Sequence, residues 1–234
     1  FECVRTNIHG AENVVNAAIR SGVSRVIALS TDKAANPVNL YGATKLASDK
    51  IFIAANNMSG EGGARFSVVR YGNVLGSRGS VVPLYQRLIA DGATSLPVTD
   101  ERMTRFWITI DQGVQFVLDN LERMSGGEIF VPKLPSMKIV DLARALAPGC
   151  DIETIGIRAG EKLHEVMVPQ DDSRTTLDLG EYFVIEPAFH HWSRENYLEI
   201  HGGEPVVEDF EYSSATNDKW LTADSLREML YANE

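Results

Sequence analysis

Tyr41 and Lys45 have the chemistry of a proton-transfer pair. They stand four residues apart near the start of a segment, Leu40 to Asn57, that we predict to be a long helix. This spacing places both side chains on one face of a helix, with the ammonium close to the phenol. A nearby cation favours the ionised phenolate, which can then accept a proton from a substrate hydroxyl. By itself the pattern is weak, because Tyr-x-x-x-Lys is also common on exposed helices that have no such function.

A second group of reactive side chains precedes this helix by about ten residues. We predict that the short apolar run 25–30 is a buried strand. This run ends in Ser30 and is followed directly by Thr31, Asp32 and Lys33. Burying a carboxylate and an amine at the end of a strand costs folding free energy, so such groups are expected there mainly when they bind a ligand or take part in catalysis. In a parallel sheet, ligands bind at the carboxyl ends of the strands, so this position favours function. The alternative is that Asp32 and Lys33 form a solvated turn.

The elements that must position these residues follow a regular order. Apolar residues with helical spacing predict a first helix that ends at Gly22. The strand 25–30, the helix 40–57 and a strand over 65–71 come next, and a glycine-rich loop follows over 72–79. This alternation predicts an α/β fold with a doubly wound parallel sheet. The ends of the two strands are therefore where we expect the site.

Further elements are expected downstream of this loop. Pro83 is expected to start a helix that runs to about Asp91, and Asp111 a helix with a buried face. That face consists of Val114, Val117, Leu118 and Leu121. We also predict strands over 128–131 and 151–157, a helix capped by Ser136, and a final helix over 223–231. From Pro169 onward the pattern weakens.

Composition excludes several classes of protein. The 234 residues carry 22 basic and 32 acidic side chains, a net charge of −10, so a nucleic acid partner is not expected. No apolar run approaches the roughly 18 residues that a membrane span requires, so no membrane association is expected. Two cysteines cannot form a disulfide framework, and we expect a reduced, cytoplasmic protein. His190 and His191 have no ligand partner at suitable spacing, so a metal site is not expected.

The first helix starts at Phe1, with no capping residue ahead of it. We therefore expect the chain to begin inside a domain. The alternative is a mature protein that begins on a helix.

Several long motifs resemble one enzyme family. They are LSTDKAANP at 29–37, LYGATK at 40–45, RYGNVLGSRGS at 70–80, MTRF at 103–106, GEIFVP at 127–132 and GIRAGEKLHE at 156–165. Together they resemble the inverting UDP-N-acetylglucosamine 4,6-dehydratases of the extended short-chain dehydrogenase/reductase superfamily, of the type that opens pseudaminic acid biosynthesis. One departure is large, because no G-x-x-G-x-x-G loop follows a strand here. Measured against the family, roughly one hundred N-terminal residues are absent, so we expect this chain to bind a dinucleotide poorly and to be inactive alone.

The resemblance implies an internal redox cycle with NADP as cofactor. Tyr41, assisted by Lys45, takes the C4 hydroxyl proton while NADP⁺ accepts the C4 hydride. Lys33, which must be neutral, removes the C5 proton, and Asp32, which must be protonated, protonates the leaving C6 hydroxyl. Hydride then returns to C6, and reprotonation at C5 from the opposite face gives inversion. Thr31 is expected to hydrogen-bond the C4 oxygen.

The resemblance also assigns binding residues. Tyr41 and Lys45 contact the cofactor, together with Val74, Leu75, Gly76, Ser77 and Arg78. Lys33, Asn73, Val81, Thr99, Arg158 and Glu161 contact the UDP-sugar substrate. Arg105 is a second phosphate candidate, whereas His164 is expected to be a packing or hydrogen-bonding residue. For the arginines, a surface salt bridge is the alternative.

The implied architecture is a Rossmann-like sheet with a smaller C-terminal substrate-binding domain. Residues 1–76 correspond to the C-terminal half of the dinucleotide-binding domain, and 107–132 return to it. Residues 77–106 and 133–234 form mainly the substrate-binding domain and a C-terminal extension. The family suggests a homo-oligomer, a hexamer. Two alternatives stay open, a UDP-sugar 4-epimerase and a non-catalytic fragment; Asp32 and Lys33 argue against the epimerase, which needs no acid and base for elimination.

Overall fold

The computed structural model describes residues 1–60, 62–188 and 192–231, and the chain forms two compact units. Unit 1 comprises Phe1–Tyr71, Val114–Lys133 and Val166–Tyr212. Unit 2 comprises Gly72–Gly113, Leu134–Glu165 and Ser213–Glu234. This division differs from the expected domains mainly in the segment 166–212, which belongs to the same unit as the first strands.

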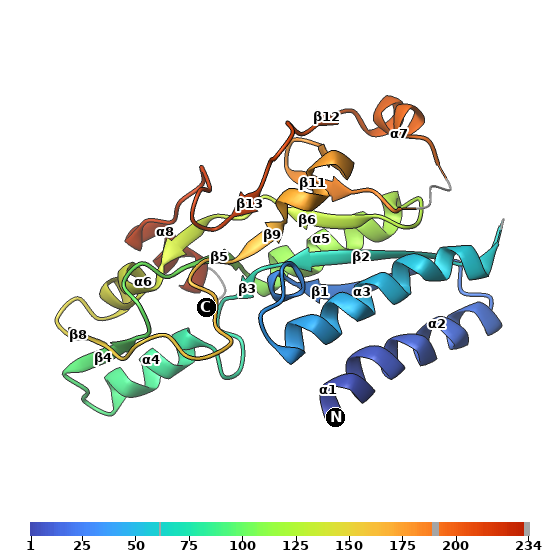
Figure 1. The fold of residues 1–234 in the computed structure, drawn as a ribbon. Coiled ribbons are helices and arrows are strands. Elements are labelled where there is room, and N and C mark those ends of the chain that lie inside the picture. Colours follow the sequence, from blue (N-terminus) through green and yellow to red (C-terminus); the bar gives the residue numbers. More distant parts are fainter. Residues whose placement is uncertain (61, 189–191, 232–234) are drawn as a thin grey trace. The chain divides into compact units, whose positions relative to one another are not determined.

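Unit 1 contains a six-stranded sheet in the order β1-β2-β6-β11-β10-β12 (Figure 1). Its parallel part is β1 (Arg25–Thr31), β2 (Arg65–Tyr71) and β6 (Ile129–Pro132), where the sequence predicts parallel strands. It is extended by β11 (Tyr182–Ile185), β10 (Thr176–Asp178) and β12 (Glu204–Pro205), which pair antiparallel. The antiparallel extension was not predicted, because its strands are short and lack a clear alternation.

The prediction that the first strand is buried is wrong. Within β1 only Ser30 is buried, and Leu29 is 49% exposed. The reason is topological, since β1 stands at the end of the strand order and, among the described residues, has only β2 as its hydrogen-bonded neighbour. The apolar residues of β1 therefore reflect a strand that is covered only in part by the described chain.

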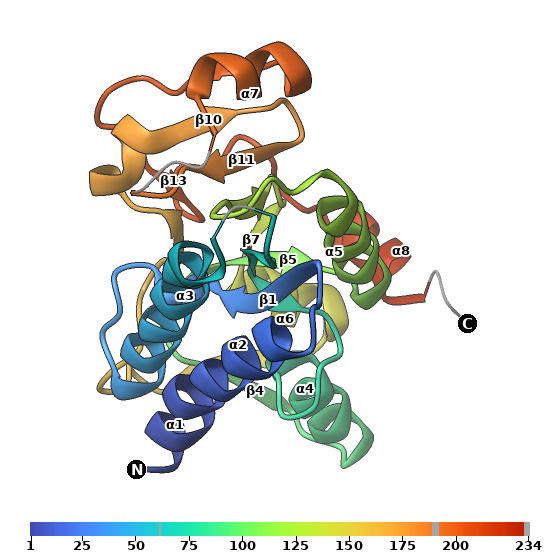
Figure 2. The ribbon, with the colours of Figure 1, turned by 90° about the vertical axis from the view of Figure 1, so that its right-hand side faces the viewer.

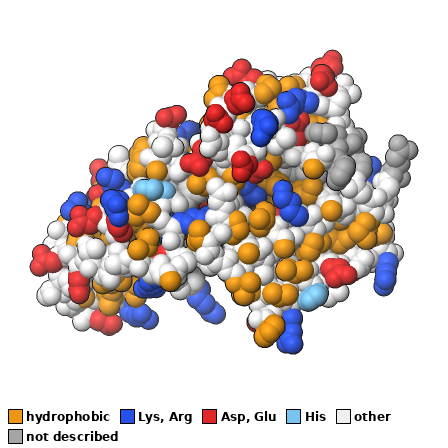
Figure 3. Space-filling view, in the orientation of Figure 1, with side chains coloured by type: hydrophobic (Ala, Val, Ile, Leu, Met, Phe, Trp, Pro, Cys, Tyr) orange, Lys and Arg blue, Asp and Glu red, His pale blue; other side chains and the backbone are white. Residues whose placement is uncertain are grey.

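Three helical segments and one long helix accompany the parallel strands. α1 (Glu2–Val4), a π-helical segment η1 (Arg5–His9) and α2 (Gly10–Arg20) follow one another, and Gly22 has a positive φ of 66°, which is typical of a glycine that ends a helix. α3 (Leu40–Ser59) packs against η1 and α2, and Figures 1 and 2 show the helices side by side. Figure 3 shows hydrophobic side chains gathered over α1, α2 and α3. The structure thus confirms both predicted helices.

The helix α5 (Ile110–Arg123) occurs where it was predicted, but its predicted buried face is wrong in part. Val117 and Leu121 pack against the core of unit 1, whereas Val114 and Leu118 are 50% and 51% exposed. The apolar stripe is wider than the surface that the described chain covers. Apolar spacing alone cannot show how much of such a stripe is covered.

Unit 2 has its own core, formed around α4 (Val81–Ala90) and α6 (Ile139–Leu146). It contains a sheet β3-β5-β7 and a parallel pair β4-β8. The bounds are Asn73–Val74 for β3, Thr104–Ile108 for β5, Ser136–Lys138 for β7, Ser95–Val98 for β4 and Asp151–Thr154 for β8. The remaining elements of the chain are η2 (Asp32–Ala34), β9 (Val166–Val168), η3 (Gln170–Thr175), α7 (Arg194–His201), β13 (Tyr212–Ser213) and α8 (Ala223–Tyr231).

Three predicted boundaries in unit 2 are wrong. The strand predicted over 151–157 ends at Thr154. α4 begins at Val81 rather than Pro83, because proline is tolerated within the first turn of a helix, where no backbone donor is needed. Ser136 does not cap a helix but lies buried in β7, where its hydroxyl receives a hydrogen bond from Asn217 Nδ2 at 2.9 Å. Among the described residues, no helix combines the length and the apolar character needed to cross a membrane.

Candidate active site

The carboxyl end of β1 brings an acid and a base into direct contact. Thr31 ends the strand, and its side chain caps the turn η2 by accepting a hydrogen bond from the Lys33 amide. Its hydroxyl also donates to Asp32 Oδ1 at 2.9 Å. Lys33 Nζ lies 2.9 Å from the same oxygen. Asp32 is fully buried, whereas the Lys33 side chain is 37% exposed, so the amine reaches the surface while the carboxylate stays inside.

The first turn of α3 is pressed against this pair. Asn39 caps the helix and accepts a hydrogen bond from the Gly42 amide at 2.9 Å. A Cβ atom at Gly42 would lie 2.3 Å from the backbone oxygen of Lys33, so only glycine allows this approach. Tyr41, the residue before Gly42, is exposed. The structure therefore places the phenol on the helix turn that contacts η2.

Lys45 is anchored to the strand rather than free on the helix surface. Its Nζ donates a hydrogen bond to the backbone oxygen of Leu29 at 2.7 Å. Burial lowers the pKa of Lys45, and the nearby charge of Asp49 raises it. A solvated Tyr-x-x-x-Lys pattern without a function does not require such an anchor.

Behind Lys45 lies a buried polar group that the sequence analysis missed. Asp49 accepts a hydrogen bond from the Ser30 hydroxyl at 2.8 Å, and Arg70 Nη2 lies 3.4 Å from the same carboxylate oxygen. Tyr71, at the end of β2, has a pKa raised by burial and by Tyr41. A carboxylate four residues after Lys45 and an arginine inside an apolar strand were the signals available in the sequence.

In unit 2, the loop after β2 forms a short strand and then two tight turns. Asn73 and Val74 form β3, which pairs with Trp107 and Ile108 of β5. Leu75 continues this ladder, because its amide donates to the Ile108 oxygen at 2.9 Å. Gly76 and Gly79 have φ values of 71° and 76°, which favour glycine. Ser77 and Arg78 lie between these glycines, and Arg78 is exposed.

The remaining predicted substrate residues are all in unit 2. Thr99 follows β4, and the segment 155–161 follows β8; because these strands are parallel, both segments leave the same edge. Arg158 and Glu161 face each other, with the Arg158 amide 3.2 Å from Glu161 Oε2 and the guanidinium 3.9 Å from Oε1. Val81 is the first residue of α4 and packs against the core of unit 2.

Arg105 does not fit the role of phosphate ligand. Its guanidinium donates to the backbone oxygens of Thr104, Leu163 and Lys162 and lies 3.6 Å from Glu165 Oε1. These contacts hold the loop 162–165 to β5 and occupy the side chain. The phosphate prediction is therefore replaced by a structural role.

His164 has the hydrogen-bonding role that the sequence suggested. Its Nδ1 lies 2.8 Å from the Thr104 hydroxyl, and burial and the charge of Arg105 lower its pKa. The histidine pair at 190–191 lies outside the described residues. Within the described part of the chain, no group of His, Cys, Asp and Glu side chains could hold a metal ion.

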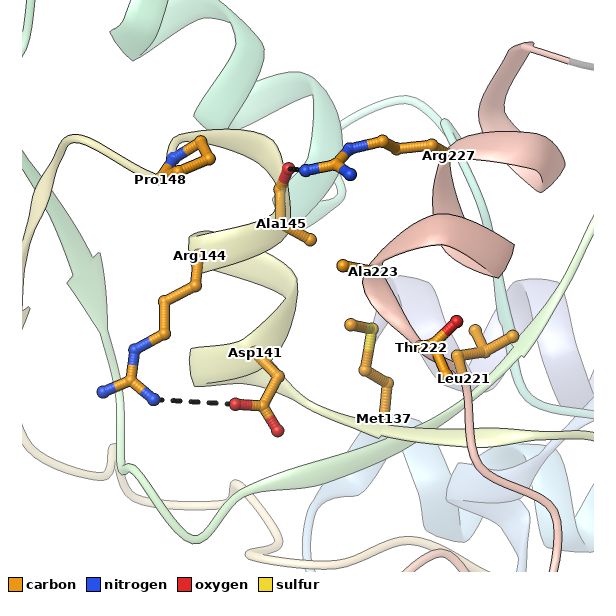
Figure 4. A pocket seen from close by; sticks show the side chains of 9 residues that line it. All are labelled: Met137, Asp141, Arg144, Ala145, Pro148, Leu221, Thr222, Ala223 and Arg227. Atoms are coloured by element: carbon orange, nitrogen blue, oxygen red, sulfur yellow. Dashed lines mark hydrogen bonds and ion pairs between the residues drawn. The ribbon is translucent and has the colours of Figure 1, made fainter.

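Unit 2 also has a pocket of about 450 Å³ between α6 and the start of α8 (Figure 4). Met137 and Leu221 supply apolar lining, while Arg227 donates to the backbone oxygen of Ala145. None of the predicted site residues lines it. It is therefore separate from the residues assigned above.

The predicted residues fall into two sets. Asp32, Lys33, Tyr41 and Lys45 converge in unit 1 at the carboxyl end of β1. The others are in unit 2: Asn73, Val74, Leu75, Gly76, Ser77, Arg78, Val81, Thr99, Arg158 and Glu161. The chemistry is thus concentrated in one unit, and the expected nucleotide contacts are in the other.

Comparisons with known proteins show the family of the chain. Residues 1–187 match the model of a family described as polysaccharide biosynthesis proteins, which fits the extended short-chain dehydrogenase/reductases. The chain belongs to that family. It is 56% identical over 238 residues to UDP-N-acetylglucosamine 4,6-dehydratase (inverting) of Campylobacter jejuni, an alignment that covers all of this chain and 71% of the relative.

A second relative has a different activity. The chain is 38% identical over 234 residues to UDP-glucose 4-epimerase of Rickettsia canadensis, with 98% of this chain and 68% of the relative covered. The similarity to the dehydratase is therefore markedly higher than that to the epimerase.

Solved structures show the same fold. The chain resembles Pen from Bacillus thuringiensis with a TM-score of 0.86 at 32% identity, covering 99% of this chain and 70% of that one. A more distant likeness, with a TM-score of 0.61 at 20% identity, is to DesIV, a dTDP-glucose 4,6-dehydratase from Streptomyces venezuelae with NAD and TYD bound; it covers 87% of this chain and 62% of that one. The chain thus has the predicted Rossmann-like α/β fold.

Proposed function

We propose that the protein is a nucleotide-sugar 4,6-dehydratase that converts UDP-N-acetylglucosamine to a 4-keto-6-deoxy sugar with inversion at C5. The observation that carries this proposal is the contact between buried Asp32 and Lys33 beside the helix turn of Tyr41. Elimination across C5 and C6 needs an acid and a base at these carbons, whereas 4-epimerisation reacts at C4 and needs no such pair at C5 and C6. The 56% identity to an inverting dehydratase supports the same conclusion.

The residues of unit 1 divide the reaction between them. Tyr41, with the ammonium of Lys45 held nearby, accepts the C4 hydroxyl proton. A nicotinamide dinucleotide bound at this site would supply the redox chemistry, as acceptor of the C4 hydride and donor of a hydride to C6. The C4 ketone acidifies the C5 hydrogen, which Lys33 removes as a proton. Asp32 then gives its proton to the C6 oxygen, which leaves as water while the C5–C6 double bond forms. Once hydride has been added at C6, C5 takes up a proton that comes from solvent, on the face opposite to Lys33, and this gives the inversion.

The ion pair in the structure supports this division of roles. Lys33 and Asp32 share a 2.9 Å contact, and transfer of one proton across it gives a neutral amine and a carboxylic acid. That is the state the elimination requires. When Lys33 gains the C5 proton and Asp32 loses its own, the pair returns to ammonium and carboxylate. No external acid or base is needed to reset it.

The residues present fit the nicotinamide end of the proposed cofactor, which we take to be NADP. A phenol, an anchored ammonium and the Thr31 hydroxyl stand at the carboxyl end of a parallel strand, where such sheets bind ligands. The segment 74–78, with Gly76 in a turn of positive φ, is assigned to the cofactor as well. No residue is assigned to the pyrophosphate of the cofactor. A phosphate-binding glycine loop follows a strand and precedes a helix, whereas Gly60, Gly62 and Gly63 follow a helix and precede a strand.

The UDP-sugar is assigned to residues of unit 2 and to Lys33. Arg158 suits the diphosphate, because its guanidinium is exposed and pairs only loosely with Glu161 at 3.9 Å. Glu161 suits the ribose hydroxyls, Val81 and Thr99 the rest of the nucleotide, and Asn73 the sugar.

We also propose that the protein forms a homo-oligomer. The exposed apolar side chains of Leu40 and Met58 on α3 support this proposal. A monomer in sedimentation equilibrium would contradict it.

Mass spectrometry of the product tests the proposed activity. The full-length protein, with the N-terminal region that the family resemblance implies, is incubated with UDP-N-acetylglucosamine in deuterated water, with no added nicotinamide consumed. Loss of one water and uptake of deuterium at C5 are expected. The 4-epimerase, which the 38% identity to an epimerase makes the second candidate, would give a product of unchanged mass without deuterium.

A further inference from the structure

Two consecutive residues of β1 hold two side chains of α3. Leu29 accepts the hydrogen bond of Lys45 Nζ through its backbone oxygen, at 2.7 Å. Ser30 donates its hydroxyl hydrogen to Asp49 Oδ2, at 2.8 Å. Lys45 and Asp49 are one helical turn apart, so they occupy the same face of α3. The strand therefore fixes the ammonium and the carboxylate relative to each other.

The carboxylate of Asp49 is buried and is held from a second strand. Ser30 and Arg70 are direct partners in the register of β1 and β2. Arg70 Nη2 lies 3.4 Å from Asp49 Oδ2, and Arg70 Nη1 donates to the Met167 oxygen at 2.9 Å. Both charged side chains are only 2% exposed. Burial of a carboxylate without such partners costs folding free energy. We therefore expect the buried Asp49 beside Lys45 to have a function.

The charges act on one another in a consistent sense. Burial raises the pKa of Asp49, while Arg70, then Ser30 and Lys45, lower it and favour the carboxylate. Burial lowers the pKa of Lys45, and Asp49 opposes this effect. A loss of the Asp49 charge would therefore leave the desolvation of Lys45 without its compensation.

Other ionisable groups near α3 are placed differently. Asp32 and Lys33 on η2 contact each other, and Tyr71 faces Tyr41. The charged residues of the packed helices, Glu2, Arg5, His9, Glu12 and Arg20, are exposed. Arg25 and Arg65 begin β1 and β2, at the opposite end of the strands. Asp49 is thus the acidic group positioned to act on Lys45.

We propose that Asp49 is a positioning residue for proton transfer at Tyr41. It keeps Lys45 protonated and seated on the Leu29 oxygen, and the ammonium in turn stabilises the Tyr41 phenolate. Ser30 and Arg70 hold Asp49 in place. The role in catalysis rests on the proposed dehydratase function, whereas the coupling between Asp49 and Lys45 is independent of any substrate.

The first test is the pKa of Lys45 in Asp49→Asn, measured by NMR of isotopically labelled lysine and assigned with Lys45→Arg. A charge about 6 Å away, acting through an effective dielectric of about 20 to 40, shifts a pKa by about one to two units. We expect a fall of at least about one unit, and recovery in Asp49→Glu. Asp119→Asn, which removes an exposed acid of α5, is the matched control and leaves Lys45 unchanged.

The same variants are followed by the pH profile of kcat/KM. In Asp49→Asn the alkaline limb moves to lower pH by the same amount, because Lys45 loses its proton earlier; a residue needed only for packing would lower the whole profile. An unchanged pKa of Lys45 in folded Asp49→Asn overturns the proposal. So does a shifted pKa in an active enzyme whose alkaline limb stays in place.

A second variant serves if Asp49→Asn does not fold. Coupling between two sites is reciprocal, so in Lys45→Met the pKa of Asp49 rises by the same one to two units, measured by carboxyl NMR. An unchanged pKa of Asp49 in Lys45→Met overturns the proposal. A shifted pKa of Asp49, together with an unmodified protein that does not dehydrate UDP-N-acetylglucosamine, would instead contradict the proposed function and leave the coupling intact.

Discussion

Replacement of Gly42 by alanine tests how closely the proposed proton-transfer helix must approach the acid–base pair. The new Cβ would lie 2.3 Å from the Lys33 backbone oxygen and 3.0 Å from Pro37 Cβ. Ordinary contacts begin at about 3.5 Å, so the first turn of α3 must move by about 1 Å. Tyr41 moves with it.

The expected effect on activity is larger than that on stability. A misplacement of about 1 Å in an active site can cost about 10²-fold in rate. Overpacking costs about 1–3 kcal/mol, and alanine returns about 1 kcal/mol of helix propensity. We therefore expect kcat for dehydration of UDP-N-acetylglucosamine to fall about 10²-fold, with a loss of about 0–2 kcal/mol in the free energy of unfolding.

Gly10→Ala is the matched control. Gly10 is also helical, but its added Cβ would meet only the Arg5 oxygen, at 3.7 Å, an ordinary contact. It should stabilise the protein by about 0.5–1 kcal/mol and leave kcat unchanged. A Gly42→Ala protein with the kcat of the unmodified protein would refute the argument that the close approach of α3 positions Tyr41.

Three further predictions concern the acid–base pair, the arginines and the histidine. Lys33→Ala should lower C5 proton exchange about 10² to 10⁴-fold while some bound cofactor is still reduced, whereas Tyr41→Phe should lose both; normal exchange in Lys33→Ala would place the base elsewhere. Arg105→Met leaves Glu165 buried without its guanidinium and should cost about 3 kcal/mol in urea unfolding. Arg158→Ala, on the surface, should change stability by less than about 0.5 kcal/mol but raise KM for the UDP-sugar, and the opposite pattern would contradict both assignments. Because burial lowers the pKa of His164, its unfolded form binds the proton more readily, so stability falls as the pH drops below about 6.5. His164→Gln should flatten the difference between urea midpoints at pH 7.5 and 5.5, and an unchanged difference would refute this.

The sequence alone was sufficient where the information is local. The helical spacing of apolar residues predicted α2, and a short apolar run predicted β1, because both patterns are set by residues that are close in the sequence. The motif Tyr41–Lys45 and the neighbouring pair Asp32–Lys33 were likewise visible, because each is defined by a few consecutive positions. Gly22 was likewise predicted to end the first helix, because a glycine is common at that position.

Only the tertiary structure decided what depends on distant partners. The exposure of Leu29 follows from the position of β1 at the end of the sheet, which no local pattern encodes. The sequence predicted that Arg105 binds phosphate. In the structure, its guanidinium instead donates hydrogen bonds to backbone oxygens of the loop 162–165, almost sixty residues away. The sequence did not indicate a role for Asp49. Its contacts depend on the register of β1 and β2, which brings Ser30 and Arg70 to its carboxylate. Hydrogen bonds and burial are properties of the assembled chain, because they depend on which residues the fold brings together from far apart in the sequence.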